Sequence, residues 1–186
     1  MSKLDLGNNE FINYEFHKNS GKPTIVFSNS LGSDLNMWNP QVEFFKNDYQ
    51  LVLYDKRGHG KSSPIQGPYN FDMLENDVIS IMDELNITTA HFIGLSMGGM
   101  TSLGLALKYP HRFNKMVCCA ARADMPPPAI ESWDQRMAVV EEKGTEGVVQ
   151  GSIERWFSDE FRNDSSNSDI INKAEEMIKS TSVQGY

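Results

Sequence analysis

A serine between two glycines offers the clearest chemistry in this sequence of 186 residues. The segment Gly94-Leu-Ser-Met-Gly98 follows a short apolar run and precedes a helix-forming run that Pro110 ends. This order of strand, sharp turn and helix is the context in which a G-x-S-x-G pattern presents its serine hydroxyl as a nucleophile. A glycine-rich turn with an incidental serine is the alternative, and the flanking strand and helix make it the weaker one.

The spacing of the two glycines has a physical reason. A serine oxygen stands clear of the backbone only on a tight, strained turn, and glycines at 94 and 98 remove the side chains that would collide there. Because a helix starts directly after Ser96, its free N–H groups and the positive end of its dipole point toward the oxyanion that forms when Ser96 attacks a carbonyl carbon. Met97 is predicted to supply one of these N–H groups.

The composition is typical of a folded, acidic protein. Hydrophobic residues make up 39% of the chain, and 17 Lys and Arg against 25 Asp and Glu give a net charge of −8 without a basic cluster. This balance argues against nucleic acid or an anionic membrane as the partner. The first residues lack the apolar stretch of a signal peptide, and no apolar run is long enough to cross a bilayer, so we expect a cytoplasmic protein.

The two cysteines do not form a recognisable framework. Cys118 and Cys119 are adjacent on a predicted strand, so their side chains point to opposite faces and cannot easily pair. We expect both to be buried apolar side chains. The spacing of the cysteines predicts neither a disulfide nor a metal site.

Strands alternate with helices over the first two thirds of the chain. A half-buried antiparallel strand is expected first and is followed by buried strands and amphipathic helices. The strands are expected at 11–17, 24–27, 49–54, 88–93 and 113–121, and the helices at about 37–47, 71–85 and 100–108. This alternation implies right-handed crossovers and an α/β fold with a mainly parallel, doubly wound sheet. The loops at 28–33, 55–60 and 122–124, together with Ser96, should then gather at the carboxyl edge of the sheet.

Residues 125–186 are predicted to form a helical cap over that edge, with residues 1–124 as the core. Three prolines at 126–128 mark the change, and no strand-like run follows them. Shared helix faces are expected for Trp133, Met137 and Val140, and for Val149, Ile153 and Trp156 or Phe157, with Gly144 as a C-cap, a loop at 163–168 and a last helix at 170–178. An independent helical domain is less favoured, because about 60 residues with few apolar anchors would be marginally stable alone.

Four segments of the sequence resemble a known family. They are SNSLGSDLNMWNPQ (28–41), YDKRGHGKSS (54–63), HFIGLSMGGMTSLGLALKYPHR (91–112) and ERWFSDEF (154–161). Over nearly all of residues 11–186 the chain resembles the α/β-hydrolase fold and, within it, the 3-oxoadipate enol-lactonases. The motifs around Ser96 and at 55–60 are shared with esterases, haloperoxidases and C–C hydrolases. The segment at 28–33 with Met37-Trp38, together with Arg155-Trp-Phe157, points to the lactonases.

The resemblance implies a reaction and a set of roles. The reaction is hydrolysis of a small enol-lactone in aromatic catabolism, the β-ketoadipate pathway, without a metal or an organic cofactor. Ser96 matches the nucleophile, and the backbone N–H groups of Met97 and Leu31 match the two oxyanion donors. For Leu31 the alternative is an ordinary turn residue.

Two further groups of residues match family positions with less specific roles. Asp55, Arg57 and the glycines at 58–60 match a structural turn whose charges are expected to satisfy one another. Trp133, Arg136 and Trp156 match cap positions from which they could line the substrate pocket, and ordinary helix packing is the alternative for all three.

A general base for Ser96 is missing from every matching position. A serine hydrolase needs a histidine held by an acid, in the chain order Ser, acid, His. His111 lies roughly 20 Å away along the helix, and His91 lies about 16 Å below the turn on the feeding strand. His17 belongs to a remote strand. His59 alone lies at the correct edge of the sheet, but its motif is a structural turn in the family, which makes it the weaker candidate for a base.

The lack of a general base leads to a prediction about the end of the chain. We expect the sequence to stop before two further strands that, in the family, deliver the acid and the histidine. The strand at 113–121 is then expected to be an exposed edge that invites oligomerisation, and the chain alone to be nearly inactive. Asp124 is a conceivable acid, but it has no histidine to orient.

Three functions remain open from the sequence. The first is a hydrolase of a small-molecule ester or lactone, most specifically an enol-lactonase in which Ser96 forms an acyl-enzyme that water resolves. The second is a general carboxylesterase or a haloperoxidase-like hydrolase. The third is a non-catalytic binding protein with the same fold. A dehalogenase is disfavoured because its nucleophile would be Asp at position 96.

Overall fold

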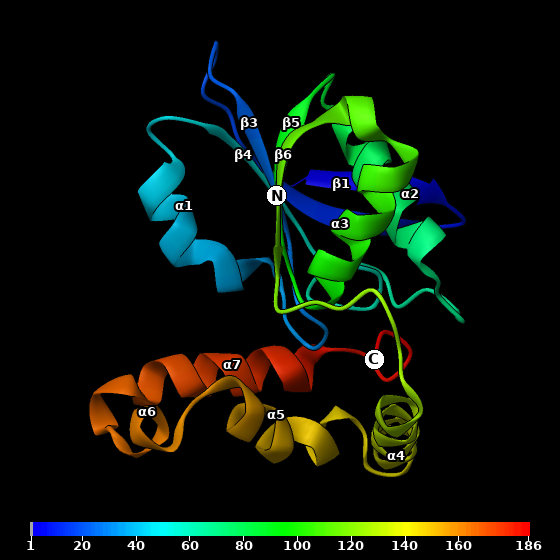
Figure 1. Cartoon of the computed structure of the whole chain (residues 1–186), viewed down its shortest axis with the longest axis vertical. Coiled ribbons are helices and arrows are strands. Elements are labelled where there is room, and N and C mark those ends of the chain that lie inside the picture. Colours follow the sequence, from blue (N-terminus) through cyan, green and yellow to red (C-terminus); the bar gives the residue numbers. More distant parts are fainter. Residues whose placement is uncertain (1) are drawn as a thin grey trace.

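The chain folds around one six-stranded sheet, shown in a computed structural model that describes residues 2–186 (Figure 1). The strands are β1 (Ser2–Gly7), β2 (Glu10–His17), β3 (Thr24–Ser28), β4 (Gln50–Tyr54), β5 (Ala90–Leu95) and β6 (Phe113–Cys119). Their spatial order is β1-β2-β4-β3-β5-β6, in which β2 is antiparallel to β1 and β4 and the other three pairs are parallel. The predicted α/β fold with a mainly parallel sheet is confirmed.

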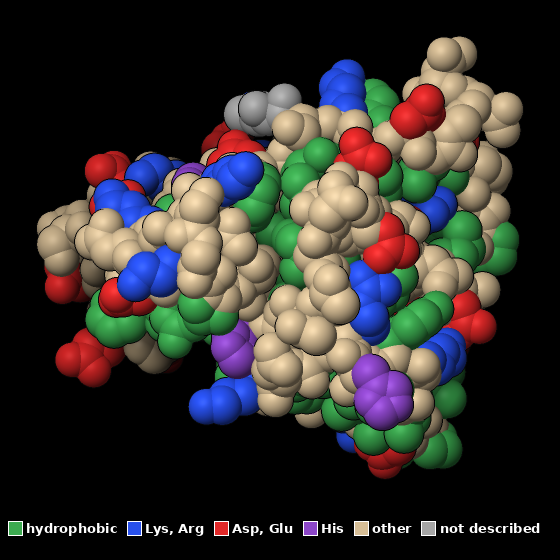
Figure 2. Space-filling model, turned by 90° about the horizontal axis from the view of Figure 1, so that it is seen from above, with side chains coloured by type: hydrophobic (Ala, Val, Ile, Leu, Met, Phe, Trp, Pro, Cys, Tyr) green, Lys and Arg blue, Asp and Glu red, His purple; other side chains and the backbone are tan. Residues whose placement is uncertain are grey.

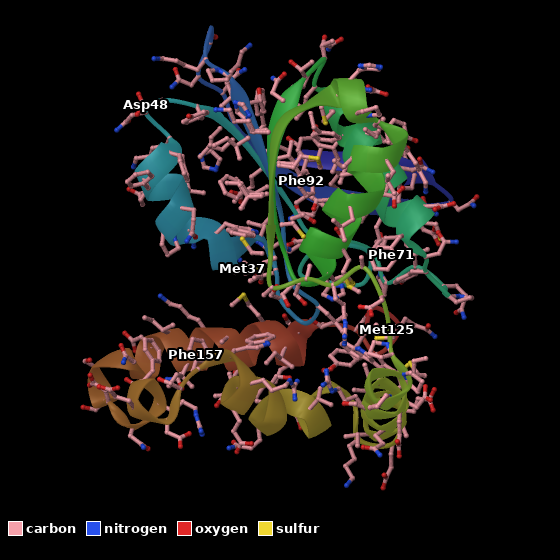
Figure 3. The ribbon with its side chains drawn as sticks, viewed as in Figure 1. Met37, Asp48, Phe71, Phe92, Met125 and Phe157 are labelled. Atoms are coloured by element: carbon pink, nitrogen blue, oxygen red, sulfur yellow. The ribbon has the colours of Figure 1, made fainter. Side chains whose placement is uncertain are left out.

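Helices cover both faces of this sheet, which explains why the central strands are apolar on both sides. The 3-10 helix η1 (Leu35–Trp38) and α1 (Asn39–Phe45) lie on one face, where the ring centroids of Phe27 and Trp38 are 5.0 Å apart. The helices α2 (Phe71–Glu84) and α3 (Met97–Lys108) lie on the other face. Phe92, fully buried there, packs in the cluster that includes Val78 and Leu105 (Figure 3).

Local sequence signals set the ends of the helices on the sheet. The Asn70 side chain caps α2 by accepting a hydrogen bond of 2.9 Å from the Met73 N–H group. Helix α3 ends at Lys108, with Tyr109 as its C-cap, because Pro110, the first residue of the short 3-10 helix η2 (Pro110–Arg112), cannot continue it. These boundaries agree with the helices expected at 71–85 and 100–108.

A second layer of helices lies beyond the carboxyl edge of the sheet (Figure 1). It contains α4 (Pro127–Lys143), η3 (Thr145–Val148), α5 (Val149–Trp156), α6 (Asp159–Asn163), η4 (Ser165–Asn167) and α7 (Ser168–Ser180). Its own apolar cluster includes Val140, Ile153 and Ile178, and Gly144 ends α4 with a φ of 69° as expected of a C-cap. We call this layer the cap. The division of the chain into units at 124/125 stays a prediction.

The chain returns from the cap to the core after α7. The backbone N–H and the hydroxyl of Ser182 both donate to the carbonyl oxygen of Gly58, each over 2.9 Å. A Cβ atom on Gly58 would lie 2.4 Å from the Cα atom of Gly185, and Gly58 has a φ of +69°. Gly58 is therefore required both for its conformation and for this close approach.

One strand and one α-helix were not expected from the sequence, besides the short 3-10 helices η2, η3 and η4. The first is β1, whose Leu4 side chain packs on the core cluster of the α2 and α3 face, and it makes Phe11 to His17 part of the second strand of the sheet. The second is α6, where the Ser158 hydroxyl caps the helix by accepting from the Phe161 N–H group. A serine followed by Asp159 and Glu160 was the signal that could have revealed it.

The sheet ends at β6 within the described residues, as expected for an exposed edge. Cys118 is exposed, Cys119 is partly exposed, and Val117 is 49% exposed. The prediction that both cysteines are buried is therefore wrong, because within residues 2–186 β6 has a neighbouring strand on one side only, although the Cys118 thiol reaches the carbonyl oxygen of Gly99 on α3. Oligomerisation through this edge stays a prediction.

The end of the molecule away from the cap carries mixed charges. In Figure 2, which looks down on that end, Lys and Arg side chains are interspersed with Asp and Glu side chains. Among the helices of residues 2–186, none combines the length and the apolar character needed to span a bilayer.

Two leucines on α3 test the packing of this helix on the sheet. Leu105 is fully buried, whereas Leu107 is 84% exposed. Leu105→Ala is expected to lower the free energy of unfolding by about 2–5 kcal/mol, because it leaves a cavity in the core. Leu107→Ala, the matched control, is expected to change it by no more than about 0.5 kcal/mol. Urea unfolding followed by circular dichroism measures both, and equal losses would contradict this packing.

Candidate active site

Ser96 occupies a strained turn between β5 and α3. Its φ of 53° and ψ of −114° are rare for a residue with a side chain and typically cost about 1–3 kcal/mol. The strain is maintained by hydrogen bonds on both sides of the residue. Its N–H group donates to the carbonyl oxygen of Cys119, and its own carbonyl oxygen accepts from the Met100 N–H group, both over 2.8 Å. The half-buried Ser96 side chain is thereby set at the carboxyl edge of the sheet.

Close backbone crossings explain the glycines on each side of Ser96. A Cβ atom on Gly94 would lie 2.2 Å from the carbonyl oxygen of Gly98, and one on Gly98 would lie 2.1 Å from the carbonyl oxygen of Ser28. Neither distance is compatible with a side chain, so the turn closes only with glycine at both positions. This is the steric role that the sequence spacing predicts.

Asn29 joins the Ser96 turn to the loop after β3. Its carbonyl oxygen accepts from the Gly98 N–H group over 3.1 Å. Its side-chain amide donates to the carbonyl oxygen of Tyr54 and its side-chain oxygen accepts from the Trp38 indole, each over 3.1 Å. Asn29 is completely buried. Asn29 was not among the predicted site residues, although a polar residue directly after a buried strand was a usable signal.

Two backbone N–H groups near this junction have no hydrogen-bond acceptor within residues 2–186. They belong to Leu31, two residues after Asn29, and to Met97, at the start of α3. Gly32, which follows Leu31, donates its own N–H group to His59 Nε2 over 3.1 Å. Such unpaired donors beside a serine hydroxyl can stabilise a developing oxyanion.

His59 is fixed in a structural position. Nε2 accepts from Gly32, and Nδ1, 2.8 Å from the carbonyl oxygen of Arg57, donates to that oxygen. Burial lowers the pKa of His59 to about 4. With both ring nitrogens engaged by the backbone, the neutral imidazole has no lone pair for the Ser96 proton.

The other three histidines lie away from the carboxyl edge of the sheet, where Ser96 is placed. His91 is near the start of β5, where its ring packs against Tyr49 with a centroid distance of 6.1 Å. His17 ends β2, and His111 lies in η2 beyond the far end of α3. In the part of the chain that the structure describes, no histidine is placed to accept the Ser96 proton.

The charges of the 55–60 turn are satisfied by groups outside it, which corrects the expectation that they pair with one another. Arg57 forms two hydrogen bonds of 2.6 and 2.7 Å with the carboxylate of Asp77 on α2. Asp55 accepts from the Asn13 side chain and from the N–H groups of Leu35 and Lys61. Burial raises the pKa of Asp55, and these donors oppose that shift. The turn thus connects β2, the η1 loop and α2.

Two predicted cap residues come together, and the third does not. The guanidinium of Arg136 lies 4.4 Å from the centroid of the Trp133 ring. Burial raises the pKa of Tyr186 and the charge of Arg136 lowers it, and the Tyr186 ring packs beside Gly32 in the loop after β3. Trp156 is 37% exposed and shares no ring contact or hydrogen bond with this group in residues 2–186.

Arg155 joins the same group, although it was not among the predicted site residues. Burial lowers the pKa of Arg155, and the neighbouring charge of Arg136 lowers it further. The only side-chain hydrogen bond of Arg155 within the described chain goes to the Ser152 hydroxyl, over 2.9 Å. Neither Arg136 nor Arg155 forms an ion pair with a carboxylate of residues 2–186. Arg136 and Arg155 are therefore two neighbouring guanidinium groups that form no ion pair within the described chain, and guanidinium groups are the donors best suited to a carboxylate.

Two cavities lie away from Ser96. One, of about 170 Å³, is lined by polar residues of the 55–61 turn and the η1 loop, including Asp34, Asp55 and Lys61. The other, of about 530 Å³, lies at the amino end of the sheet. Neither is lined by Ser96 or by the Arg136 group.

Residues 2–186 contain no group of three or more His, Cys, Asp or Glu side chains that could hold a metal ion. Figure 3 shows Met37 and Met125 on the side of the core that faces the cap.

The buried neutral state of His59 predicts a pH dependence of stability. Its pKa of about 4 in the folded chain lies below the ordinary value of 6.5, so the unfolded chain binds more protons between these pH values. The free energy of unfolding should therefore rise with pH across this window, with a slope of at most about 1.4 kcal/mol per pH unit from this group.

Removing the imidazole tests this dependence. His59→Asn is expected to flatten the profile of unfolding free energy between pH 4 and 6.5, measured by urea unfolding. His111→Asn, at an exposed position, is the control and should leave the slope unchanged. A wild-type slope retained in His59→Asn would show that other groups cause the dependence.

Comparison with known proteins places the chain in a family. The sequence pattern of the alpha/beta hydrolase fold family matches residues 23–180. The chain is 38% identical over 175 residues to 3-oxoadipate enol-lactonase 2 of Acinetobacter baylyi, covering 94% of this chain and 64% of that protein. It is 41% identical over 164 residues to 3-oxoadipate enol-lactonase 1 of the same organism, covering 88% and 60%.

Structural comparison agrees with the sequence match. The crystal structure of the enol-lactonase from Burkholderia xenovorans superposes with a TM-score of 0.89 at 32% identity, covering 96% of this chain and 68% of that one. The chain thus spans about 60–64% of the length of the two Acinetobacter relatives. By its sequence pattern, its fold and its sheet topology, the chain belongs to the alpha/beta hydrolase fold family.

Proposed function

We propose that the chain carries the nucleophile and the oxyanion site of a hydrolase that opens a small lactone or ester. The observation that carries this proposal is the strained Ser96 turn with the acceptor-free N–H groups of Met97 and Leu31 beside it. Cytoplasmic location and a place in aromatic catabolism are part of the same proposal.

The reaction follows from this arrangement. The Ser96 oxygen attacks the acyl carbon of the lactone, and the N–H groups of Met97 and Leu31 bind the oxyanion of the tetrahedral intermediate. Collapse of the intermediate breaks the ring C–O bond, and the released enol oxygen takes up a proton while the acyl group stays on Ser96. Water then attacks the acyl-enzyme and releases the carboxylic acid.

The proton of Ser96 needs a base that residues 2–186 do not place beside it. We assign this base, and the acid that orients it, to the part of the relatives' length that the chain does not cover. By itself the chain is then expected to bind substrate and to turn it over very slowly. Ligand binding without catalysis is the second candidate, favoured by the same lack of a placed histidine.

The substrate of this proposal carries a carboxylate. Arg136 and Arg155 are neighbouring cations without a carboxylate partner, in a chain whose net charge is −8. Tyr186 links them to the loop of Leu31 by packing beside Gly32. We infer that they receive the carboxylate of the lactone, with Trp133 as an apolar neighbour. The names of the relatives supply the specific candidate, 3-oxoadipate enol-lactone. A general carboxylesterase or a haloperoxidase-like hydrolase would not need this charge.

A complementation experiment tests the proposed nucleophile. Residues 1–186 are joined to the remaining third of 3-oxoadipate enol-lactonase 2 from Acinetobacter baylyi, and hydrolysis of the enol-lactone is followed by absorbance. We expect turnover by the fusion and a fall in kcat/KM by a factor of about 10³ or more for Ser96→Ala, since the nucleophile is lost.

A second serine on α3 provides the control. Ser102 is buried and its hydroxyl donates to the carbonyl oxygen of Gly99, so Ser102→Ala should keep kcat/KM within about threefold. Full activity in Ser96→Ala would refute the proposed mechanism. Cleavage of 4-nitrophenyl acetate without cleavage of the lactone would refute the substrate and leave an esterase. A folded fusion that binds the lactone and cleaves neither compound would support the binding protein.

The anion site is tested on the chain itself by ligand binding. Titration calorimetry with 3-oxoadipate, the carboxylate product of the proposed reaction, is expected to show weaker binding by a factor of about 10 or more in Arg136→Gln and in Arg155→Gln, because each loses a charge-assisted hydrogen bond. Arg162→Gln is the matched control, since Arg162 also lies in the cap but pairs with Asp159. Equal affinity in all three variants would remove the carboxylate from the proposal.

A further inference from the structure

Lys56 is a buried amine that the proposed mechanism does not use. It lies between Asp55 and Arg57 in the turn after β4, and only 1% of it is exposed. Its Nζ atom donates to the carbonyl oxygen of Asn29 and lies 5.7 Å from the centroid of the Tyr54 ring. Within residues 2–186 it forms no ion pair. A cation without a counter-ion is costly to bury, so its one strong acceptor determines its orientation.

The carbonyl oxygen of Asn29 that accepts from Lys56 also connects the loop after β3 to the Ser96 turn. The same Asn29 carbonyl oxygen accepts the Gly98 N–H group over 3.1 Å. Asn29 precedes Leu31 by two residues, and Gly98 follows Ser96 by two residues. One oxygen atom therefore connects three segments that are distant in sequence: the loop after β3, the turn after β4 and the start of α3.

We propose that Lys56 is a positioning residue that holds the Leu31 loop against the Ser96 turn through the Asn29 carbonyl, and that gain or loss of its proton changes this connection. The roles of Leu31 and Ser96 in catalysis rest on the proposed function. The connection itself rests only on the hydrogen bonds and the burial described above.

The physical basis is the strength of the shared hydrogen bond. A hydrogen bond from an ammonium group is shorter and stronger than one from a neutral amine. When Lys56 is charged it polarises the Asn29 carbonyl, and when it is neutral the Gly98 N–H group has less competition for that oxygen. The spacing between the Leu31 and Ser96 segments then depends on the charge of Lys56.

Burial makes the ammonium form of Lys56 less stable than that of an exposed lysine. Burial lowers the pKa of Lys56 to about 7, and the charge of Asp55 opposes this shift. The other groups that face it titrate elsewhere, since the pKa of His59 is about 4 and burial raises that of Tyr54 well above its ordinary value of 10.0. A transition near pH 7 at this junction is therefore assigned to Lys56.

Nuclear magnetic resonance of the 15N-labelled chain tests this proposal. The amide signals of Gly98 and Leu31 are expected to shift together between pH 5.5 and 8.5, with a midpoint near 7. Lys56→Met, which has a similar length and no proton to exchange, should abolish this transition. Lys46→Met is the matched control, because Lys46 is an exposed lysine paired with Glu43, and it should keep the transition.

The outcomes separate this inference from the proposed function. Amide signals of the wild-type chain that do not change near pH 7, or a transition that survives in Lys56→Met, would overturn the role of Lys56. The wild-type titration decides the question even where Lys56→Met fails to fold. Because the readout is a chemical shift and not hydrolysis, it does not depend on the fusion being active. A Gly98 transition together with an inactive fusion would support the connection and refute only the catalytic proposal.

Discussion

The site depends on the close crossing of two backbone segments. The chain at Ser28 and Asn29 passes so near Gly98 that no side chain fits between them, and the Gly98 N–H group is bound to the Asn29 carbonyl oxygen. This contact fixes the loop after β3 against the start of α3. The strained conformation of Ser96 and the free N–H groups of Leu31 and Met97 lie within two residues of it. A small change at the crossing would alter all three together.

Polar side chains can be buried around this crossing because each of them has hydrogen-bond or ion-pair partners. Asp55 receives three donors, Arg57 is held by Asp77, and His59 uses both ring nitrogens for the backbone. These interactions come from four different elements, so the turn after β4 acts as a common anchor for them. Arg136 and Arg155 in the cap bond only to serine hydroxyls and form no ion pair with a carboxylate of residues 2–186. This contrast between a satisfied core and an unsatisfied cap is the electrostatic reason for assigning an anion to the cap.

Much of the fold was predictable because its signals are local. Continuous β-branched and aromatic runs indicated β3 and β4, and helical spacing indicated α2. The steric need for Gly94 and Gly98 was also visible in the sequence. The partner of Arg57 was not, since the pairing with Asp77 depends on how α2 lies on the sheet. Arg155 and Asn29 were missed for the same reason: their importance comes from neighbours that are distant in sequence.

The exposure of Cys118 and Cys119 has a similar origin. Their apolar strand predicted burial, but burial on a strand also requires a neighbour on each side, and β6 has one only at β5 in residues 2–186. Periodicity identifies the strand and says nothing about its position in the sheet. The site residues predicted from the sequence are therefore those whose role is carried by the backbone around them, whereas those that act through tertiary contacts emerged from the structure.

The hydrogen bonds between Ser182 and Gly58 restrict how the cap can move. The cap is connected to the core by the chain before Pro127 and again by the chain after Ser180, and the second connection is fastened to the turn that contains Lys56 and His59. A body attached at two points can rock about the line between them, but it cannot swing away from one hinge. Any larger movement of the cap relative to the core would have to break the Ser182 bonds. Through the Ser182 hydrogen bonds to Gly58, the turn after β4 is both a structural anchor of the core and one of the two points at which the cap is attached.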